Sequence, residues 1–245
     1  MLEINPQKGN LQLLENIKNI YRKISSAAIR SGRSPFDVQL IAVTKTVPVE
    51  RIREAVELGL RDFGENRVQE AKEKISNLKS KILNENIKWH LIGHLQKNKV
   101  KTAVQLFDLI HSLDSFELAN LINKYAEKEE KIQRVLIQVK LSEEATKHGV
   151  AKEELMRLIE TVSKMKNIKL EGLMTMPPFF EDPEKARPFF KKLCELRDEV
   201  EQKGYKIKEL SIGMTNDFEI AILEGATMVR IGTGIFGERI INKRR

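Results

Sequence analysis

The first candidate for chemistry is a lysine that follows a short apolar run near the start of the chain. Lys45 comes two residues after the run VQLIAV, residues 38–43. A lysine at the end of a buried strand is partly desolvated, which disfavours its charged form, and a neutral amine can attack a carbonyl carbon to form a Schiff base. The alternative is a structural lysine whose ammonium group extends into solvent. Lys45 is therefore a candidate for covalent attachment of an aldehyde.

A second candidate is a glycine-rich segment near the other end of the chain. The segment VRIGTGIFG, residues 229–237, contains the pattern G-x-G-x-x-G at Gly232, Gly234 and Gly237. A dinucleotide-binding fingerprint requires a strand–helix–strand unit of about 30 residues, and the eight residues after Gly237 are too few for one. Glycine-rich turns also let backbone N–H groups approach an anion, so we expect this segment to bind a phosphate group.

Two further features support an anionic ligand. The segment SIGMTND, residues 211–217, is a second glycine-containing turn, and Ser211 and Thr233 add hydroxyl groups. Arg230 lies inside an apolar run, where an arginine is costly unless it pairs with a carboxylate of a neighbouring strand or faces a ligand. Together with Lys45 these residues suggest a phosphorylated aldehyde. Pyridoxal 5′-phosphate (PLP) fits, because the lysine would take the aldehyde and the two turns the phosphate.

Other catalytic chemistries find little support in the sequence. His90 and His94 are four residues apart in WHLIGH, but this segment lacks the glutamate of an H-E-x-x-H zinc motif. Cys194 is the only cysteine, which excludes a disulfide within the chain and a zinc site built from cysteines. No G-x-S-x-G motif of a serine hydrolase occurs. We therefore predict no metal site and no serine triad.

The elements that must position these residues alternate between two kinds of pattern. Short apolar runs, typical of strands buried on both faces of a parallel sheet, alternate with amphipathic helical stretches. The predicted strands are residues 38–43, 62–65, 88–93, 106–112, 134–141, 170–176, 207–213 and 227–232. The predicted helices between them are residues 48–58, 67–83, 96–104, 115–128, 152–166, 183–203 and 216–223, and none is predicted after the last strand.

Eight strands in this arrangement predict a (β/α)8 barrel, an α/β fold of the TIM type. The length of 245 residues suits such a barrel, and a doubly wound open sheet is the alternative. No linker or shift in composition occurs, so we predict one domain over residues 1–245, with a helix within residues 1–34 that flanks the barrel. Function gathers at the carboxyl ends of the strands of such a barrel, and Lys45 follows a strand in this way.

Composition and charge restrict the classes of function. With 41% hydrophobic and 32% charged residues the chain is globular, and no apolar run approaches the length that spans a bilayer. Residues 1–10 lack the apolar core of a secretory signal, so we expect a cytoplasmic protein with no membrane partner. The net charge of +8 and the terminal NKRR would suit nucleic acid, but acidic and basic residues alternate along the helices, as in residues 72–81. We therefore predict no nucleic-acid partner.

Several motifs, in one order along nearly the whole chain, resemble those of the YggS/PROSC family of pyridoxal phosphate homeostasis proteins. They are AVTKTVP (42–48), FGENRVQEAKEK (63–74), WHLIGHLQKNKVK (89–101), IHSLDS (110–115), EGLMTM (171–176), SIGMTNDFEIAI (211–222) and VRIGTGIFGER (229–239). The resemblance implies a single-domain barrel like the N-terminal domain of alanine racemase, with PLP as its cofactor. The residues that it implies for PLP are Lys45 as the Schiff-base lysine, Arg230 facing the pyridine nitrogen, Ser211, Gly232 and Thr233 at the phosphate, Asn66 in the pocket, and Met214 and Thr215 in the loop after Ser211.

The chain departs from the family pattern at a few positions. Thr44 and Thr215 replace frequent serines and keep a hydroxyl group. Val47 stands where many members have a second lysine, which puts in doubt any release or relay of cofactor through that lysine. Lys147 is a candidate second cofactor lysine, with an ordinary surface lysine as the alternative.

The same residues favour a carrier over an efficient racemase. An arginine beside the pyridine nitrogen opposes its protonation, which makes the ring a poorer electron sink. Racemisation also needs acid and base groups on both faces of the substrate carbon, and Tyr21, Tyr125 and Tyr205 do not follow predicted strands. We expect a monomeric PLP-binding homeostasis protein that supplies PLP-dependent apo-enzymes. The alternatives are a racemase-type PLP enzyme and a binder of anionic polymers.

Overall fold

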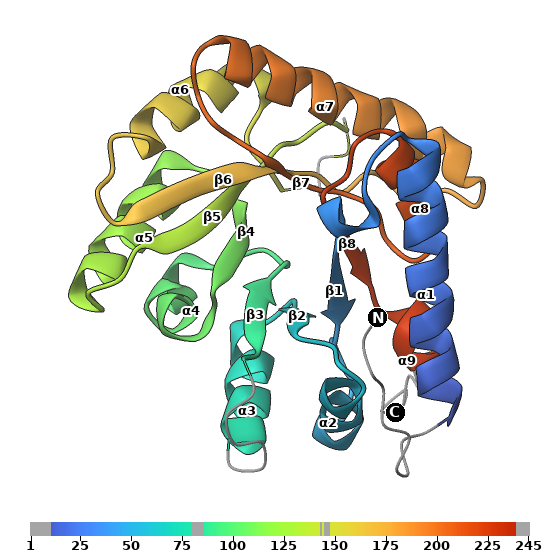
Figure 1. Cartoon of the computed structure of the whole chain (residues 1–245). Coiled ribbons are helices and arrows are strands. Elements are labelled where there is room, and N and C mark those ends of the chain that lie inside the picture. Colours follow the sequence, from blue (N-terminus) through green and yellow to red (C-terminus); the bar gives the residue numbers. More distant parts are fainter. Residues whose placement is uncertain (1–10, 80–85, 143, 145–147, 239–245) are drawn as a thin grey trace.

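Eight parallel strands form one closed barrel in the computed structural model, which describes residues 11–79, 86–142, 144 and 148–238. The strands follow chain order around the barrel, and β1 closes it by pairing with β8 (Figure 1). They are β1 Gln39–Val43, β2 Asp62–Glu65, β3 Lys88–Leu91, β4 Leu109–Leu113, β5 Gln133–Gln138, β6 Ile168–Met174, β7 Glu209–Ser211 and β8 Met228–Ile231. The predicted barrel and its strands are confirmed, and the open sheet is not formed.

Helices make the outer layer of the molecule. They are α1 Leu11–Arg30, α2 Val49–Glu57, α3 Val68–Lys79, α4 Val100–Leu106, α5 Phe116–Lys128, α6 Lys152–Val162, α7 Arg187–Gln202, α8 Phe218–Leu223 and α9 Thr233–Phe236, with short 3-10 helices η1 Pro35–Asp37, η2 Lys97–Lys99 and η3 Pro183–Ala186. One expectation was wrong, because α9 follows the last strand. The amides of Ile235 and Phe236 each donate to Gly232 O at 2.9 Å, so the glycine-rich segment itself turns into this helix.

None of the helices in the described ranges is both long enough and apolar enough to cross a membrane.

Helix α1 flanks the barrel, as the sequence predicts. Its apolar residues share one face, and this face packs against α8 and α9 (Figure 1). Beyond the helix, the guanidinium group of Arg33 donates to Ala226 O at 3.0 Å and to Ile222 O at 2.6 Å. The helix therefore supports the side of the barrel that carries the glycine-rich turn.

The barrel has an interior of mixed character. A small apolar cluster joins residues of β1, β4, β5, β6 and β8, which can meet only inside the barrel; it consists of Ile41, Leu109, Leu136, Met174 and Met228. The strands also carry buried polar side chains, among them His90, His111, Ser211 and Arg230. Burial of a polar group is costly without a hydrogen-bond partner, so the partners of these four residues show how the interior is organised.

Candidate functional site

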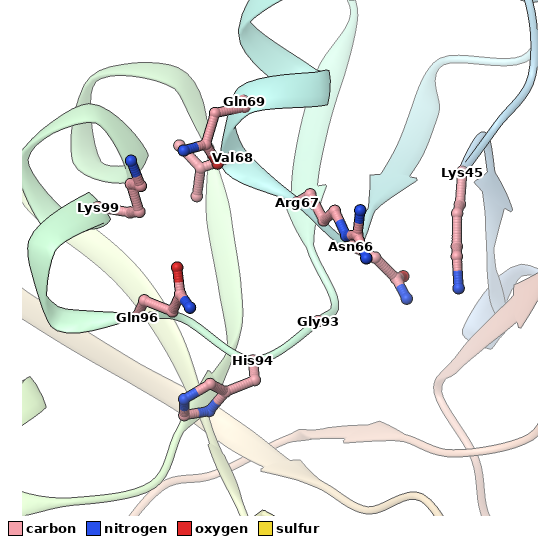
Figure 2. A pocket seen from close by; sticks show the side chains of 9 residues that line it. All are labelled: Lys45, Asn66, Arg67, Val68, Gln69, Gly93, His94, Gln96 and Lys99. Carbon is pink, nitrogen blue, oxygen red and sulfur yellow. The ribbon is translucent and has the colours of Figure 1, made fainter.

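Lys45 lies just beyond the carboxyl end of β1, half-buried, in a cavity of about 510 Å³. The cavity is lined by Lys45, Asn66, Arg67, Val68, Gln69, Gly93, His94, Gln96 and Lys99. Figure 2 shows the side chains of Lys45 and Asn66 extending into the same part of this cavity, with His94, Gln96 and Lys99 across from them. The structure therefore brings together two of the predicted site residues, Lys45 and Asn66.

The backbone before Lys45 is held by a buried ion pair. The hydroxyl of Thr44 donates to Glu65 Oε1 at 2.7 Å, and the ammonium group of Lys74 donates to the same oxygen at 2.7 Å and to Thr44 O at 2.6 Å. Glu65 is fully buried, and this burial raises the pKa of its carboxyl group. The pair ties the end of β1 to β2 and α3. It thereby fixes the position of the backbone from which the Lys45 side chain extends.

The backbone after Lys45 is held from the same helix. Thr46 N donates to Glu70 Oε1 at 2.6 Å, and Lys74 donates to that oxygen at 2.6 Å. Thr46 has a φ of 63°, in the left-handed region that a β-branched residue rarely adopts. This turn aims the chain away from the strand directly after Lys45, and the Glu70 contact stabilises it.

Asn66 is placed by a close approach of two loops. A Cβ atom at Gly93 would lie 2.3 Å from Asn66 O, so only glycine allows the segment after β3 to pack here. Gly93 is followed by His94, which lines the same cavity. The loops after β2 and β3 are therefore held together at the cavity wall.

Arg230 is buried in β8 and faces neutral oxygens. Its Nη1 donates to Ser211 O at 2.6 Å and to Ser211 Oγ at 2.5 Å, and its Nη2 donates to Thr175 O at 3.0 Å. Burial lowers the pKa of the guanidinium group to about 10, and the carboxylate of Asp217 opposes this shift. Among the described residues no carboxylate forms an ion pair with Arg230, so the structural ion pair considered from the sequence is not found there.

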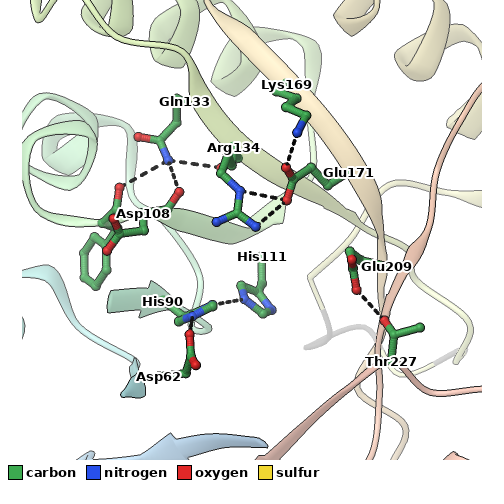
Figure 3. Close-up of polar contacts among 11 residues, drawn as sticks. Asp62, His90, Asp108, His111, Gln133, Arg134, Lys169, Glu171, Glu209 and Thr227 are labelled. Atoms are coloured by element: carbon green, nitrogen blue, oxygen red, sulfur yellow. Dashed lines mark hydrogen bonds and ion pairs between the residues drawn. The ribbon is translucent and has the colours of Figure 1, made fainter. Parts of the chain in front are cut away.

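A line of hydrogen bonds continues from Ser211 through the barrel. His111 Nδ1 lies 2.9 Å from Ser211 Oγ, His111 Nε2 lies 3.0 Å from His90 Nδ1, and His90 Nε2 lies 3.1 Å from Asp62 Oδ1. Figure 3 shows His90 between Asp62 and His111. Burial first, and then the charges of His90 and Arg230, lower the pKa of His111 well below its usual value of 6.5. His111 is therefore neutral at physiological pH.

When both imidazoles are neutral, the bonds in this line run in one consistent direction. A guanidinium group can only donate, so Ser211 accepts from Arg230 and has its own proton available for His111 Nδ1. At the other end the Asp62 carboxylate accepts from His90 Nε2, which leaves His90 Nδ1 to accept from His111 Nε2. The Arg230 end is compatible with these tautomers. The only proton of the Ser211 hydroxyl then goes to His111, and the hydroxyl would donate to a phosphate only by giving up that bond.

A second cavity, of about 440 Å³, lies beside the end of β1. It is lined by Val43, Phe179, Phe180, Met214, Thr215, Asn216, Asp217, Gly232 and Thr233. The hydroxyl of Thr233 donates to that of Thr215 at 3.2 Å, and Gly234 N donates to the same oxygen at 3.4 Å. A Cβ atom at Gly232 would lie 3.3 Å from Val43 O, so the glycine-rich turn packs closely on the strand that leads to Lys45.

The predicted site residues therefore fall into three groups. Lys45 and Asn66 line the first cavity, Met214, Thr215, Gly232 and Thr233 line the second, and Ser211 and Arg230 are buried. The candidate Lys147 and the NKRR tail lie outside the described residues.

The sequence did not reveal the polar residues that support these groups. His90 and His111 lie in apolar runs. The only signal in the sequence is that a polar residue type occurs in an otherwise apolar strand, which indicates a polar contact inside the barrel. Lys74 lies on a helix rich in charge, where nothing distinguishes it from exposed neighbours such as Lys72.

Comparisons with known proteins agree along nearly the whole chain. Residues 14–240 match the alanine racemase N-terminal domain family. A pyridoxal phosphate homeostasis protein of Aquifex aeolicus is 47% identical over 226 residues, which cover 92% of this chain and 97% of the relative. The structure of PipY from Synechococcus elongatus without PLP has a TM-score of 0.83 at 35% identity, covering 92% of this chain and 100% of PipY.

The structure of the same PipY protein with PLP bound gives a similar match. Its TM-score is 0.80 at 36% identity, again over 92% of this chain and 100% of PipY. The closed barrel, its flanking helix α1 and these full-length matches lead to one assignment. This chain belongs to the family of pyridoxal phosphate homeostasis proteins, which share the fold of the alanine racemase N-terminal domain.

Proposed function

We propose that this chain binds PLP at the carboxyl ends of β1, β7 and β8 and acts in PLP homeostasis as a binder and carrier. The observation that carries the proposal is the placement of Arg230. Arg230 lies in β8 and pairs in register with Ile41 of the neighbouring strand β1, four residues before Lys45. A buried cation that forms no ion pair with a carboxylate of the described residues therefore lies on the strand next to the one that leads to the candidate lysine. Full-length relatives named pyridoxal phosphate homeostasis proteins support the same function.

The residues present fit PLP in charge and shape. Bound PLP supplies an aldehyde to which a lysine amine can attach, a phosphate group and a ring nitrogen. We assign the aldehyde to Lys45, the pocket wall to Asn66, and the phosphate to the turn with Gly232 and Thr233. The close packing of Gly232 on Val43 leaves little room for a side chain there, which suits a turn whose backbone approaches an anion.

The remaining predicted residues complete the assignment. Thr215 and Met214 line the second cavity beside Thr233, and we place them around the phosphate. Arg230 is assigned to the ring nitrogen. Because the Ser211 hydroxyl is bonded to Arg230 and His111, we propose that Ser211 acts on PLP by orienting Arg230 as well as by its position near the phosphate turn.

The arrangement favours storage over turnover of amino acids. Arg230 keeps a positive charge at neutral pH, since its pKa is about 10, and a cation at the ring nitrogen opposes protonation there. Tyr21 lies in α1, Tyr125 in α5 and Tyr205 after α7, so no tyrosine follows the carboxyl end of a strand. No tyrosine is therefore placed at this end of the barrel to act as the second acid or base for racemisation.

The test is attachment of PLP to Lys45. We expect protein incubated with PLP to show the yellow absorbance of lysine-linked PLP, and borohydride followed by peptide mapping to place the label on Lys45. Lys45→Ala should abolish both signals, while Lys99→Ala, which removes another lysine of the same cavity, should retain them. A label that persists in Lys45→Ala would overturn the assignment, and rapid turnover of alanine or serine would overturn the carrier role.

Three finer points belong to the same proposal. We propose that PLP-dependent apo-enzymes are the recipients, that the chain acts as a monomer, and that it acts in the cytoplasm. Val47 occupies the position of the second lysine of many relatives, so transfer should proceed without a relay through that position. Light scattering of the purified chain tests the monomer, and transfer of PLP to an apo-enzyme in the presence of a scavenger of free PLP tests direct delivery.

A further inference from the structure

Two histidines and an aspartate converge above three consecutive strands, at a place that the proposed PLP site does not use. His94 follows β3, Asp114 follows β4, and His148 lies in the segment after β5. His94 Nδ1 lies 3.4 Å from Asp114 Oδ2, and one nitrogen or oxygen atom from each of the three side chains lies within 4.8 Å of the others. The rings of His94 and His148 are stacked, with centroids 3.8 Å apart and planes 12° from parallel.

The backbone under His148 is bound to the end of β5. Gln138 Nε2 donates to His148 O at 2.9 Å, and Val150 N donates to Gln138 O at 2.8 Å. Gly149 between them has a φ of 136°, a conformation that favours glycine, and a Cβ atom there would lie 2.6 Å from Lys140 N. The chain therefore turns back to β5 directly after His148. This turn places the imidazole of His148 near the ends of β3 and β4.

The backbone positions of the other two residues, His94 and Asp114, are also held by local packing and hydrogen bonds. Gly93 packs against Asn66 O, which positions the backbone of His94. Asp114 lies between the last residue of β4 and Ser115, whose hydroxyl accepts from Leu118 N at 3.3 Å at the start of α5. Three potential ligands thus come from three separate, well-anchored segments and not from a single loop.

The sequence predicts no metal site, but from this geometry we propose that His94, Asp114 and His148 form a binding site for a divalent transition-metal ion of the Zn²⁺ type. Imidazole nitrogens and a carboxylate oxygen are ligands of Zn²⁺, with bond lengths that place neighbouring ligand atoms about 3.3 Å apart in a tetrahedral site. The pair formed by His94 and Asp114 already has this spacing at 3.4 Å. His148 is exposed and can rotate to complete the site.

The proposed site lies beside the first cavity, which His94 also lines. Three protein ligands leave one tetrahedral position for water or another ligand. His94 also lines the cavity of Lys45, and Figure 2 shows it on the wall across from that lysine. A metal ion here would therefore lie at the rim of the same cavity without replacing any residue assigned to PLP.

The competing explanation is that the cluster only links loops, with His94 paired to Asp114 and His148 stacked on top. That arrangement predicts no saturable metal binding. Cys194, another residue that could attract Zn²⁺, lies on α7, and burial raises the pKa of its thiol to about 11, which makes it a weak ligand.

The experiment is calorimetric titration of untagged, full-length protein with Zn²⁺, because a polyhistidine tag would itself bind the metal. Unbound PLP is removed beforehand, since it also chelates metals. We expect one equivalent of Zn²⁺ to bind, and Co²⁺ to give the visible absorbance of a tetrahedral site. Asp114→Asn and His148→Ala should each weaken binding by at least about tenfold, whereas Asp198→Asn and Cys194→Ser, which change residues on α7, should bind as the parent does.

Thermal unfolding separates loss of the site from loss of the fold. The two site variants should unfold in the presence of a chelator at the temperature of the parent protein, and only the parent should be stabilised by added Zn²⁺. They should also retain the absorbance of lysine-linked PLP, so a failed metal site and a failed PLP site give different results. Absence of saturable binding to the parent, or equal Zn²⁺ affinity in Asp114→Asn and His148→Ala, would overturn the proposal.

Discussion

His111 Nδ1 lies 2.9 Å from the hydroxyl oxygen of Ser211, and this contact joins the middle of β4 to the end of β7 across the barrel interior. The hydroxyl in turn accepts from Arg230, so the orientation of the buried guanidinium depends on a histidine of a distant strand. Asp62, His90, His111 and Ser211 therefore act as positioning residues for Arg230, while Lys74 and Glu65 do the same for the backbone at Lys45.

Replacement of Ser211 by alanine tests the support of Arg230. The change leaves one guanidinium N–H and His111 Nδ1 without this partner, and loss of a buried hydrogen bond to a charged group costs about 1.5–3 kcal/mol. We expect a loss of stability of this size in denaturant unfolding, together with weaker retention of PLP.

Ser112 offers a matched control in the same barrel. Its hydroxyl is buried in β4 and has no hydrogen-bond partner within the described part of the chain. Ser112→Ala should therefore be neutral or stabilising. Equal losses of stability in Ser112→Ala and Ser211→Ala would show that removal of any buried hydroxyl, and not the contact with Arg230, accounts for the effect.

The neutral state of His111 predicts a pH dependence of stability. Because the pKa of His111 is lowered well below 6.5 in the folded chain, the unfolded chain binds more protons below about pH 6.5. The free energy of unfolding should then fall with falling pH, by up to about 1.4 kcal/mol per pH unit, and His111 should contribute no slope above that range. Denaturant unfolding at a series of pH values from neutral to mildly acidic measures this dependence. In His111→Gln the free energy of unfolding should change less steeply with pH near pH 6.

Two carboxyl groups act in the opposite direction and must be separated from His111. Burial raises the pKa values of Glu65 and Asp217. Each binds its proton more tightly in the folded chain, so its contribution to stability is present at low pH and is lost as pH rises through its folded pKa. A slope near pH 6 that is the same in the parent and in His111→Gln would contradict the assignment to His111.

Removal of the Lys74 charge tests the anchor of Lys45. Lys74→Met leaves the buried Glu65 carboxylate without its cation, and breaking a buried pair in this way costs about 3–5 kcal/mol. The exposed Lys72→Met on the same helix should change stability little. Adding Glu65→Gln to Lys74→Met removes the uncompensated charge and should recover part of the loss.

The Lys74 variants also separate fold from function. At a temperature where Lys74→Met remains folded, we expect slower or weaker PLP attachment to Lys45, because the carbonyl of Thr44 has lost its ammonium donor. Unchanged attachment would show that the Lys45 backbone is positioned without Lys74.

The order of strands and helices was determined by the sequence, because strands buried on both faces carry continuous apolar runs and surface helices carry a one-sided apolar stripe. The short helix α9 was missed, since four residues are too few to show a period. Lys45 could be singled out because it closely follows such a run, and the motifs around it identify the family.

Only the tertiary structure decided which polar residues meet. His90 and His111 are 21 residues apart and Ser211 is a further 100 residues along the chain, and their contacts arise from barrel closure, which no local pattern encodes. The same holds for Lys74, buried by its contacts with β1 and β2, and for the convergence of His94, Asp114 and His148 from three strand ends. The physical reason is that local periodicity records whether a side chain is buried, whereas the pairing of strands sets what it is buried against.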